Sequence, residues 1–407
     1  MADGQVNLSG IPAYETFVRL VTQNIGVMPE IKLDENGTAH RIQIFDGPDA
    51  IPRVLFSKRA LARYKCCKDV LGYVLGKKSP ESLCNMACLL LGKDLLLNNR
   101  FAGAALIAHA FTKLRSKYTC DSEVFDYMLA GVREDNQAAT INFFHPLAHE
   151  IGHLERAQAL APAPIHSDKF LDTYRINYDA IWPIVGDLDY QACQKDEQSP
   201  LYLPLLREEV ISDWFAVNAV MYLVCHRTRD RKFEMTEAFA SLVMFPLIAA
   251  FEETCLKEWR STRFTQQVLL ATQCRFSILI DSMRATGKKL FPNHHADVDE
   301  SMRDMNTLYD EALRIIWQGA VQFMSLSGDL MKLTDFEVAE YIRKETHKEQ
   351  WFDLHSYLAA ILDDSKGYPI FESNRAALRK AFDTMITFEA LVIMDNGVVI
   401  IPKKGGS

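Results

Sequence analysis

The segment His149-Glu150-Ile151-Gly152-His153 is the feature that most constrains this chain. On an α-helix, residues four positions apart lie on one face, so His149 and His153 can present two imidazoles to a single metal ion. The carboxylate of Glu150 then lies beside them at the same cleft. The spacing therefore predicts a helix that carries two metal ligands and an adjacent acidic group.

Two histidines and a glutamate at this spacing form the motif of zinc hydrolases. Catalytic zinc binds neutral imidazole nitrogens and keeps one position open for water. A carboxylate beside that water can take its proton as the water attacks a carbonyl carbon. We therefore predict one Zn²⁺ per chain, with His149 and His153 as ligands and Glu150 as the general base. The alternative is a surface helix in which the motif occurs by chance.

The residues around the motif predict a strand, a tight turn and then the helix. Residues 138–144 are rich in β-branched and aromatic side chains, and His145-Pro146 follows them. Proline suits the first helical position, so His145 is expected at the helix cap in a capping or packing role. An extra metal ligand or a substrate contact is the alternative role for His145. Gly152 costs about 1 kcal/mol of helix propensity relative to alanine, so we expect it to permit close approach by another segment.

A second predicted helix, at 205–216, supplies further carboxylates. Catalytic zinc usually has three protein ligands, and a carboxylate is a common third one. Glu209 and Asp213 are four residues apart and share a face, so Glu209 is predicted to bind the metal. Asp213 is predicted to accept the second N–H of a liganding histidine, His149, and to fix its tautomer. Glu208 competes with Glu209 for the ligand role, although only Glu209 has an aspartate at the matching offset.

The pairing of His149-Glu150-x-x-His153 with Glu209-x-x-x-Asp213 resembles the gluzincins, the thermolysin-like zinc metallopeptidases. The resemblance implies that His149, His153 and Glu209 bind zinc, that Glu150 is the general base, and that Asp213 supports a histidine. Residues 209–213 are close to the thermolysin pattern at every position. The separation between His153 and Glu209 is longer than in the thermolysin type, and it leaves the subfamily open. The resemblance covers residues 138–217.

Hydrolysis of an amide also needs a hydrogen-bond donor for the developing oxyanion. Residues 155–204 lie between the two predicted metal-site helices, and their prolines and aromatic residues are typical of either a substrate wall or a packed connecting subdomain. The residue types alone do not choose among the candidate oxyanion or substrate contacts, which are His145, His166, Tyr174, Tyr178, His226 and Arg263.

Composition limits the class of protein. The 407 residues are 48% apolar and 24% charged, which is enough for two or three hydrophobic cores. A net charge of −8 argues against a nucleic-acid partner. The longest apolar run, 238–251, is interrupted by Pro246 and is shorter than the ~20 residues that span a bilayer, so we expect a buried core helix and no membrane. Nine scattered cysteines and the absence of a signal-peptide pattern predict a cytoplasmic protein with reduced thiols.

We predict a mostly helical α+β fold with a zincin-like catalytic core, in which a strand precedes the active-site helix, and with helical N- and C-terminal regions. The predicted domains are 1–135, 136–290 and 291–407. Outside the core we expect a hairpin around Asn36-Gly37, a strand at 54–56, helices near 57–76, 80–97, 99–117, 263–285, 298–325, 335–346, 350–363 and 373–387, and a closing hairpin at 390–401.

These features together predict a zinc-dependent endopeptidase that acts on a protein or peptide substrate, as a selective intracellular protease with a regulatory or defence role. The alternative is a metal-binding regulatory or sensor module with little or only triggered proteolysis. The substrate, the cleavage site, the trigger and the oligomeric state are not specified by the sequence.

Overall fold

A computed structural model describes residues 8, 11–34, 37, 39–45, 47, 50–77, 124–134, 136–167, 188–225, 232–256, 262–327, 392–393 and 399–400. The chain divides into two compact units, each assembled from separate stretches. The first unit contains every described residue of the predicted metal site, and it draws on all three predicted domains. It comprises Met1–Leu61, Glu123–Ala250 and Gln266–Arg314, and the second unit comprises Ala62–Ser122, Phe251–Thr265 and Ile315–Ser407.

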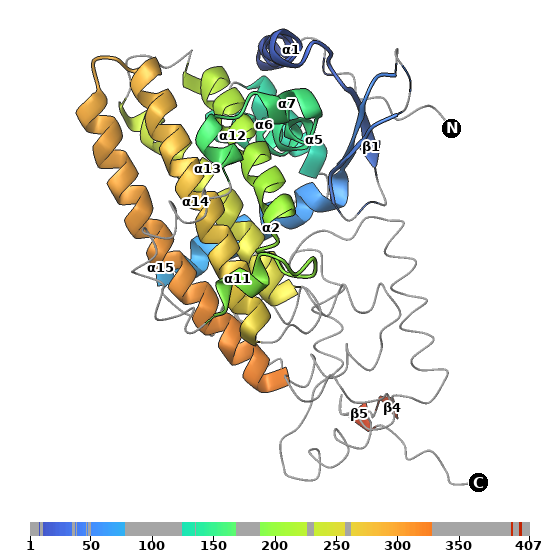
Figure 1. Cartoon of the computed structure of the whole chain (residues 1–407), viewed down its shortest axis with the longest axis vertical. Coiled ribbons are helices and arrows are strands. Elements are labelled where there is room, and N and C mark those ends of the chain that lie inside the picture. Colours follow the sequence, from blue (N-terminus) through green and yellow to red (C-terminus); the bar gives the residue numbers. More distant parts are fainter. Residues whose placement is uncertain are drawn as a thin grey trace. The chain divides into compact units, whose positions relative to one another are not determined.

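The described residues form a mostly helical α+β fold with one small three-stranded sheet (Figure 1). The N-terminal elements are α1 (Pro12–Ile25), β1 (Glu30–Asp34), β2 (Arg41–Gln43), β3 (Arg53–Ser57) and α2 (Lys58–Lys77). The central elements are α5 (Val124–Arg133), α6 (Gln137–Gly152), α7 (Glu155–Ala159), α8 (Ala163–His166), α11 (Tyr190–Cys193) and α12 (Leu203–Cys225). The later elements are α13 (Lys232–Phe251), the π-helix η2 (Glu252–Leu256), α14 (Thr262–Leu290), α15 (His295–Ser327), β4 (Val392–Ile393) and β5 (Val399–Ile400).

The sheet has β3 at its centre, so the predicted hairpin between β1 and β2 is wrong. β1 pairs with β3 in parallel, and β2 pairs with β3 antiparallel. Burial explains this order, because Val54 and Phe56 of β3 are 0% and 1% exposed. The strand with the most buried side chains takes the central position, whereas the short β2 remains at the edge.

The predicted strand at 138–144 is also wrong, because these residues belong to α6. The helix begins after Asn136, whose side chain accepts a hydrogen bond from the Ala139 backbone N–H at 3.0 Å. Buried residues recur at helical spacing through Ile141, Phe144 and Ile151, so burial of this face outweighs the β-propensity of the individual residues. Pro146 lies inside the helix and not at its first turn.

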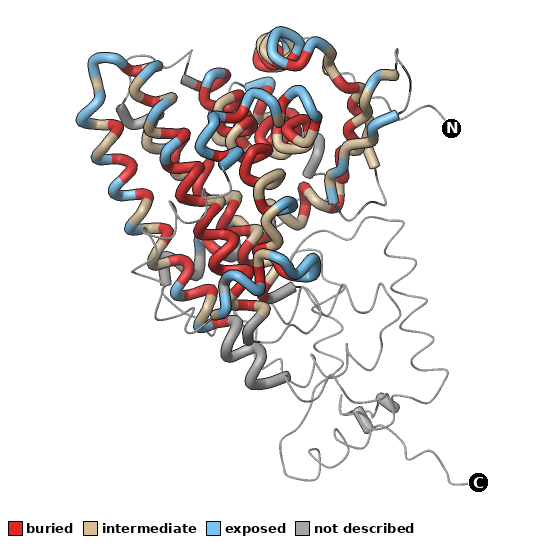
Figure 2. The backbone as a smooth tube through the Cα atoms, in the orientation of Figure 1, coloured by how far each residue is buried: buried red, intermediate tan, exposed pale blue. Residues whose placement is uncertain are grey.

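The core of the first unit lies between α6, α12, α13 and α14. α6 and α12 form the most extensive helix pair, and residues of α12 are buried on most of its sides (Figure 2). α14 is joined to α12 by a hydrogen bond from Thr286 Oγ1 to Asn218 Oδ1 at 2.5 Å. Ring stacking between Phe276 and Tyr309 joins α14 to α15. The two helices predicted near 263–285 and 298–325 are confirmed as α14 and α15.

Several predictions concern the remaining parts of the chain. β4 and β5 form the predicted C-terminal hairpin, and α2 matches the helix predicted near 57–76. In the second unit, Arg63 Nε pairs with Glu252 Oε1 at 2.8 Å. Cys67, Cys193 and Cys274 are buried and form no disulfide within the described part of the chain. The helices predicted near 80–97, 99–117, 335–346, 350–363 and 373–387 lie outside the described residues.

The apolar helix around Pro246 is longer than predicted. α13 continues through this proline, and the stretch Met235–Thr254 is long and apolar enough to cross a membrane by length and composition alone. However, 67% of its apolar window is buried inside the protein, as it is in a core helix.

Candidate metal centre

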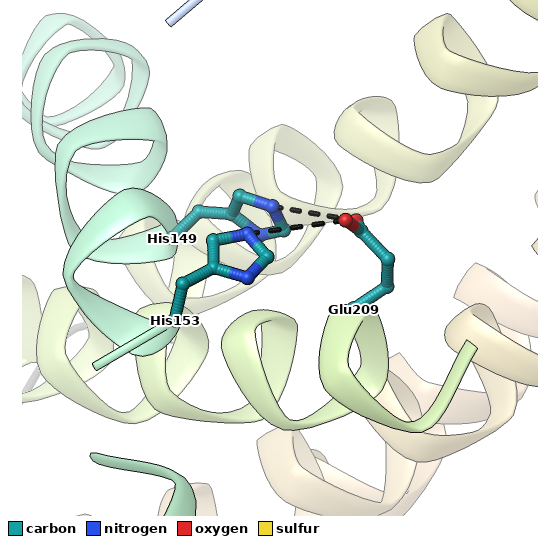
Figure 3. A group of neighbouring side chains, drawn as sticks. All are labelled: His149, His153 and Glu209. Atoms are coloured by element: carbon teal, nitrogen blue, oxygen red, sulfur yellow. Dashed lines mark ion pairs between the residues drawn. The ribbon is translucent and has the colours of Figure 1, made fainter. Parts of the chain in front are cut away.

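Three potential metal ligands converge in the first unit, and they come from the two helices that pack most extensively (Figure 3). His149 Nε2 lies 3.5 Å from Glu209 Oε2, and His153 Nε2 lies 3.9 Å from Glu209 Oε1. In a tetrahedral zinc site with bonds of about 2.0–2.1 Å, ligand atoms are about 3.3 Å apart. Two imidazoles and a carboxylate therefore fit zinc in donor type, and their ligand atoms lie within 4.8 Å of one another.

The close crossing of α6 and α12 positions these ligands. His149 lies in the last turn of α6 and His153 at its C-cap. A Cβ atom on Gly152 would lie 2.6 Å from Ser212 Cα in α12, so only glycine permits this approach. The predicted close approach at Gly152 is confirmed. Gln158 of α7 reinforces the crossing, because its side-chain amide donates to the Gly152 carbonyl of α6 at 2.6 Å and to Ser212 Oγ of α12 at 3.4 Å.

Each histidine turns its second ring nitrogen toward a carboxylate of α12. His149 Nδ1 lies 3.0 Å from Asp213 Oδ1, in an ion pair whose N–H is not aligned for a hydrogen bond. His153 Nδ1 lies 2.9 Å from Glu208 Oε1. These contacts leave both Nε2 atoms facing Glu209. Glu208, which competed for the ligand role in the sequence, thus lies where it can orient His153.

The carboxylates also determine the charge of His149. Burial by itself lowers the pKa of His149, but the adjacent carboxylates of Asp213 and Glu209 outweigh it and raise the pKa to about 10. In the absence of a metal, the ring is therefore an imidazolium at neutral pH. A metal ion that binds Nε2 must displace this proton.

Arg275 of α14 is a member of the site that the sequence analysis missed. Its Nη1 lies 3.1 Å from Glu209 Oε2, while its Nε and Nη2 donate to the two oxygens of Asp213 at 2.6 and 3.0 Å. Burial tends to raise the pKa values of Glu209 and Asp213, but Arg275 and His149 hold both well below their usual range. The guanidinium thus keeps the buried carboxylate of Asp213 and the partly exposed carboxylate of Glu209 ionised.

Glu150 lies beside the ligands and contacts the edge strand of the sheet. The Ile42 backbone N–H of β2 lowers the pKa of its carboxyl group. Burial raises the pKa of Glu150 above its usual value, and the charges of His149 and His153 partly oppose this rise. A carboxyl group with a raised pKa is suited to exchanging protons near neutral pH.

His40, which immediately precedes β2 and contacts Phe56 of β3, was not predicted from the sequence either. Its ring stacks on Phe56, which contacts Phe143 of α6. His40 Nδ1 accepts a hydrogen bond from the Ser57 backbone N–H at 3.1 Å, so Nε2 carries the proton of the neutral ring. Burial, and then the charge of His149, lower the pKa of His40 to about 3. At neutral pH this residue is therefore an uncharged N–H donor.

His145 is not at the helix cap as predicted, because α6 extends well before it. The residue is 3% exposed, and its ring stacks on Phe245 of α13 with 3.7 Å between ring centroids. Neither ring nitrogen has a hydrogen-bond partner among the described residues. His145 therefore packs α6 against α13, so the packing role is the one observed and the expected position at the helix cap is wrong.

The burial of His145 predicts a loss of stability in acid. Burial, opposed by the charge of Asp213, lowers the pKa of His145 to about 3, and His149 and Arg275 lower it further. The unfolded chain takes up a proton at this residue below pH 6.5, whereas the folded chain does so only near pH 3. Because of this residue, the free energy of unfolding therefore decreases by about 2 kcal/mol between pH 7 and pH 5.

Urea unfolding of the zinc-free protein at both pH values measures this loss. In His145→Phe, which keeps the aromatic contact with Phe245, we expect the decrease to be smaller by about 2 kcal/mol. Equal decreases in wild type and variant would show that His145 does not cause the acid sensitivity.

Among the other sequence candidates, the structure describes His166 and the backbone of Arg263. His166 is the last residue of α8 and is exposed. Arg263 lies in the first turn of α14, in a segment that belongs to the second unit. Tyr174, Tyr178 and His226 lie outside the described residues.

The chain was compared with known protein families, curated proteins and solved structures. No protein-family model matches the chain, and no curated protein or solved structure matches it significantly.

Proposed function

We propose that this protein is a zinc-dependent endopeptidase of the gluzincin type, with a zincin-like core. The observation that carries the proposal is the convergence of His149, His153 and Glu209, with the half-buried Glu150 next to His149 in the sequence. The ligand set contains three protein groups, as in catalytic zinc sites, whereas structural sites usually have four. A bound zinc ion would supply an activated water and a Lewis acid for the substrate carbonyl.

The residues of this chain perform the remaining tasks. Glu150 takes the proton from the attacking water and passes it to the leaving amine, and its raised pKa favours this exchange. Asp213 and Glu208 hold the two histidines with their Nε2 atoms toward the metal. We assign the oxyanion-donor role to His40, because its Nδ1 accepts from Ser57 and its neutral ring therefore carries the proton on Nε2.

Glu150→Gln tests the proposed function, because it removes the base with little change in shape. We expect the variant to keep its zinc and to lose hydrolysis of quenched fluorescent casein by at least about 100-fold. The matched control is Glu155→Gln, the same change at an exposed residue of α7, which should cleave like wild type. Equal cleavage by Glu150→Gln and wild type would contradict the proposed role of Glu150.

The same assay addresses the sensor alternative. If zinc-loaded wild type cleaves neither casein nor a mixed peptide pool, the endopeptidase proposal loses its support. The site would then fit a metal-binding regulatory module.

A further inference from the structure

The guanidinium of Arg275 bridges two carboxylates that lie one turn apart on α12. One edge of the group, through Nε and Nη2, binds both oxygens of Asp213. The remaining nitrogen, Nη1, lies 3.1 Å from Oε2 of Glu209. Asp213 is 8% exposed and Arg275 is 23% exposed, so water weakens these interactions less than it does at the surface. Arg275 thus contacts both the predicted third ligand and the partner of His149.

Glu209 by itself does not determine how many of its oxygens reach a metal. Oε2 lies 3.5 Å from His149 Nε2, and Oε1 lies 3.9 Å from His153 Nε2. Both distances are compatible with ligands of one ion, so either oxygen or both could coordinate. Two-oxygen coordination would occupy an additional position around the metal, next to the one that water needs.

We propose that Arg275 makes Glu209 a one-oxygen ligand, by holding Oε2 and leaving Oε1 to the metal. This inference rests on the proposed metal site. Arg275 is a positioning residue, because it acts through Glu209 and Asp213. Three nitrogens of the planar guanidinium make these contacts, two to Asp213 and one to Glu209, and the single ammonium nitrogen of a lysine cannot reproduce that fixed geometry. The Thr286–Asn218 hydrogen bond, further along α14 and α12, helps to fix the two helices that carry this bridge.

Arg275→Lys tests the proposal, because lysine keeps the positive charge and removes the fork. Cobalt(II) serves as the probe, since its visible absorption weakens as its coordination number rises. We expect wild type to give an intense four-coordinate spectrum and Arg275→Lys a weaker one. We also expect cobalt affinity to fall about 10-fold, the lower end of the usual effect of losing such a partner. Circular dichroism establishes that each variant is folded.

The matched control is Arg284→Lys, on the same helix. Arg284 is 37% exposed and pairs with Asp281 and Asp299, away from the ligands. This control should leave both the spectrum and the affinity unchanged. An Arg275→Lys protein with the wild-type spectrum and affinity would overturn the proposal while leaving the metal site intact. Failure of wild type to bind cobalt would overturn the proposed metal function itself.

A second pair of variants covers the case in which Arg275→Lys does not fold. Arg275→Gln combined with Asp213→Asn removes the cation together with the buried charge that it neutralises. Compared with Asp213→Asn alone, the double variant should show the same decrease in cobalt absorption. Identical spectra of these two proteins would overturn the proposal.

Discussion

Glu209→Gln is expected to lose nearly all bound zinc, whereas the identical change at Glu208 should retain it. The Glu209 carboxylate faces both Nε2 atoms, and a neutral amide is a much poorer zinc ligand. Glu208 contacts the other nitrogen of His153, and the carbonyl oxygen of glutamine can still accept that N–H. We expect the zinc dissociation constant to rise more than about 100-fold for Glu209→Gln and less than about 10-fold for Glu208→Gln.

Competition with a chromophoric chelator measures these dissociation constants, and elemental analysis gives the zinc content. Glu150→Gln is a further control that should keep its zinc, because Glu150 is the proposed base and not a ligand. If Glu208→Gln lost the metal and Glu209→Gln kept it, Glu208 would be the third ligand. Equal zinc content in all three variants would remove the carboxylate from the ligand set.

The short-range part of the site could be predicted from the sequence because helical spacing alone determines it. Residues four apart share one face in any helix, which brings His149 near His153 and Glu209 near Asp213. The close approach at Gly152 could likewise be predicted from the sequence. A glycine in an apolar helix is unfavourable unless another backbone passes close by, and Ser212 does so here.

The long-range part could not be predicted, because no periodic pattern links distant segments. Arg275 is 62 positions after Asp213, and the sequence shows only an arginine in an apolar helix. His40 and Ile42 reach the site from the sheet, and their strand order depends on the burial of β3. An arginine among buried positions does indicate an acidic partner, but it does not identify which one.

The error at 138–144 has a different cause. The local preference of β-branched and aromatic residues for strands competes with burial on a helical face, and packing against α12 decides the outcome. Asn136 was the available signal, because an asparagine before a run of alanines is typical of a helix start. This helix also carries His149, so its packing against α12 places the first ligand.

Gly152→Ala is expected to destabilise the protein and to weaken zinc binding together. The new Cβ would lie 2.6 Å from Ser212 Cα and 3.1 Å from the Ser212 carbonyl oxygen, and backbone atoms cannot move aside as a flexible side chain can. α6 and α12 must therefore separate, at a cost of about 1–3 kcal/mol in the free energy of unfolding. Because the ligands lie on these two helices, their separation should also misplace Glu209 and lower hydrolysis by on the order of 100-fold.

Gly72→Ala is the matched control, because Gly72 lies in a helix and, among the described residues, no atom beyond its own helical backbone lies within 4 Å of the added Cβ. Alanine should stabilise α2 by about 0.5–1 kcal/mol and leave zinc binding unchanged. Urea unfolding of the zinc-free protein measures the effect of the substitution on packing alone, because bound zinc would itself increase the free energy of unfolding. If Gly152→Ala lowered stability but bound zinc normally, the helix crossing would support the fold without setting the ligand geometry. A coupled loss of both would show that the close contact at Ser212 holds the two halves of the metal centre together.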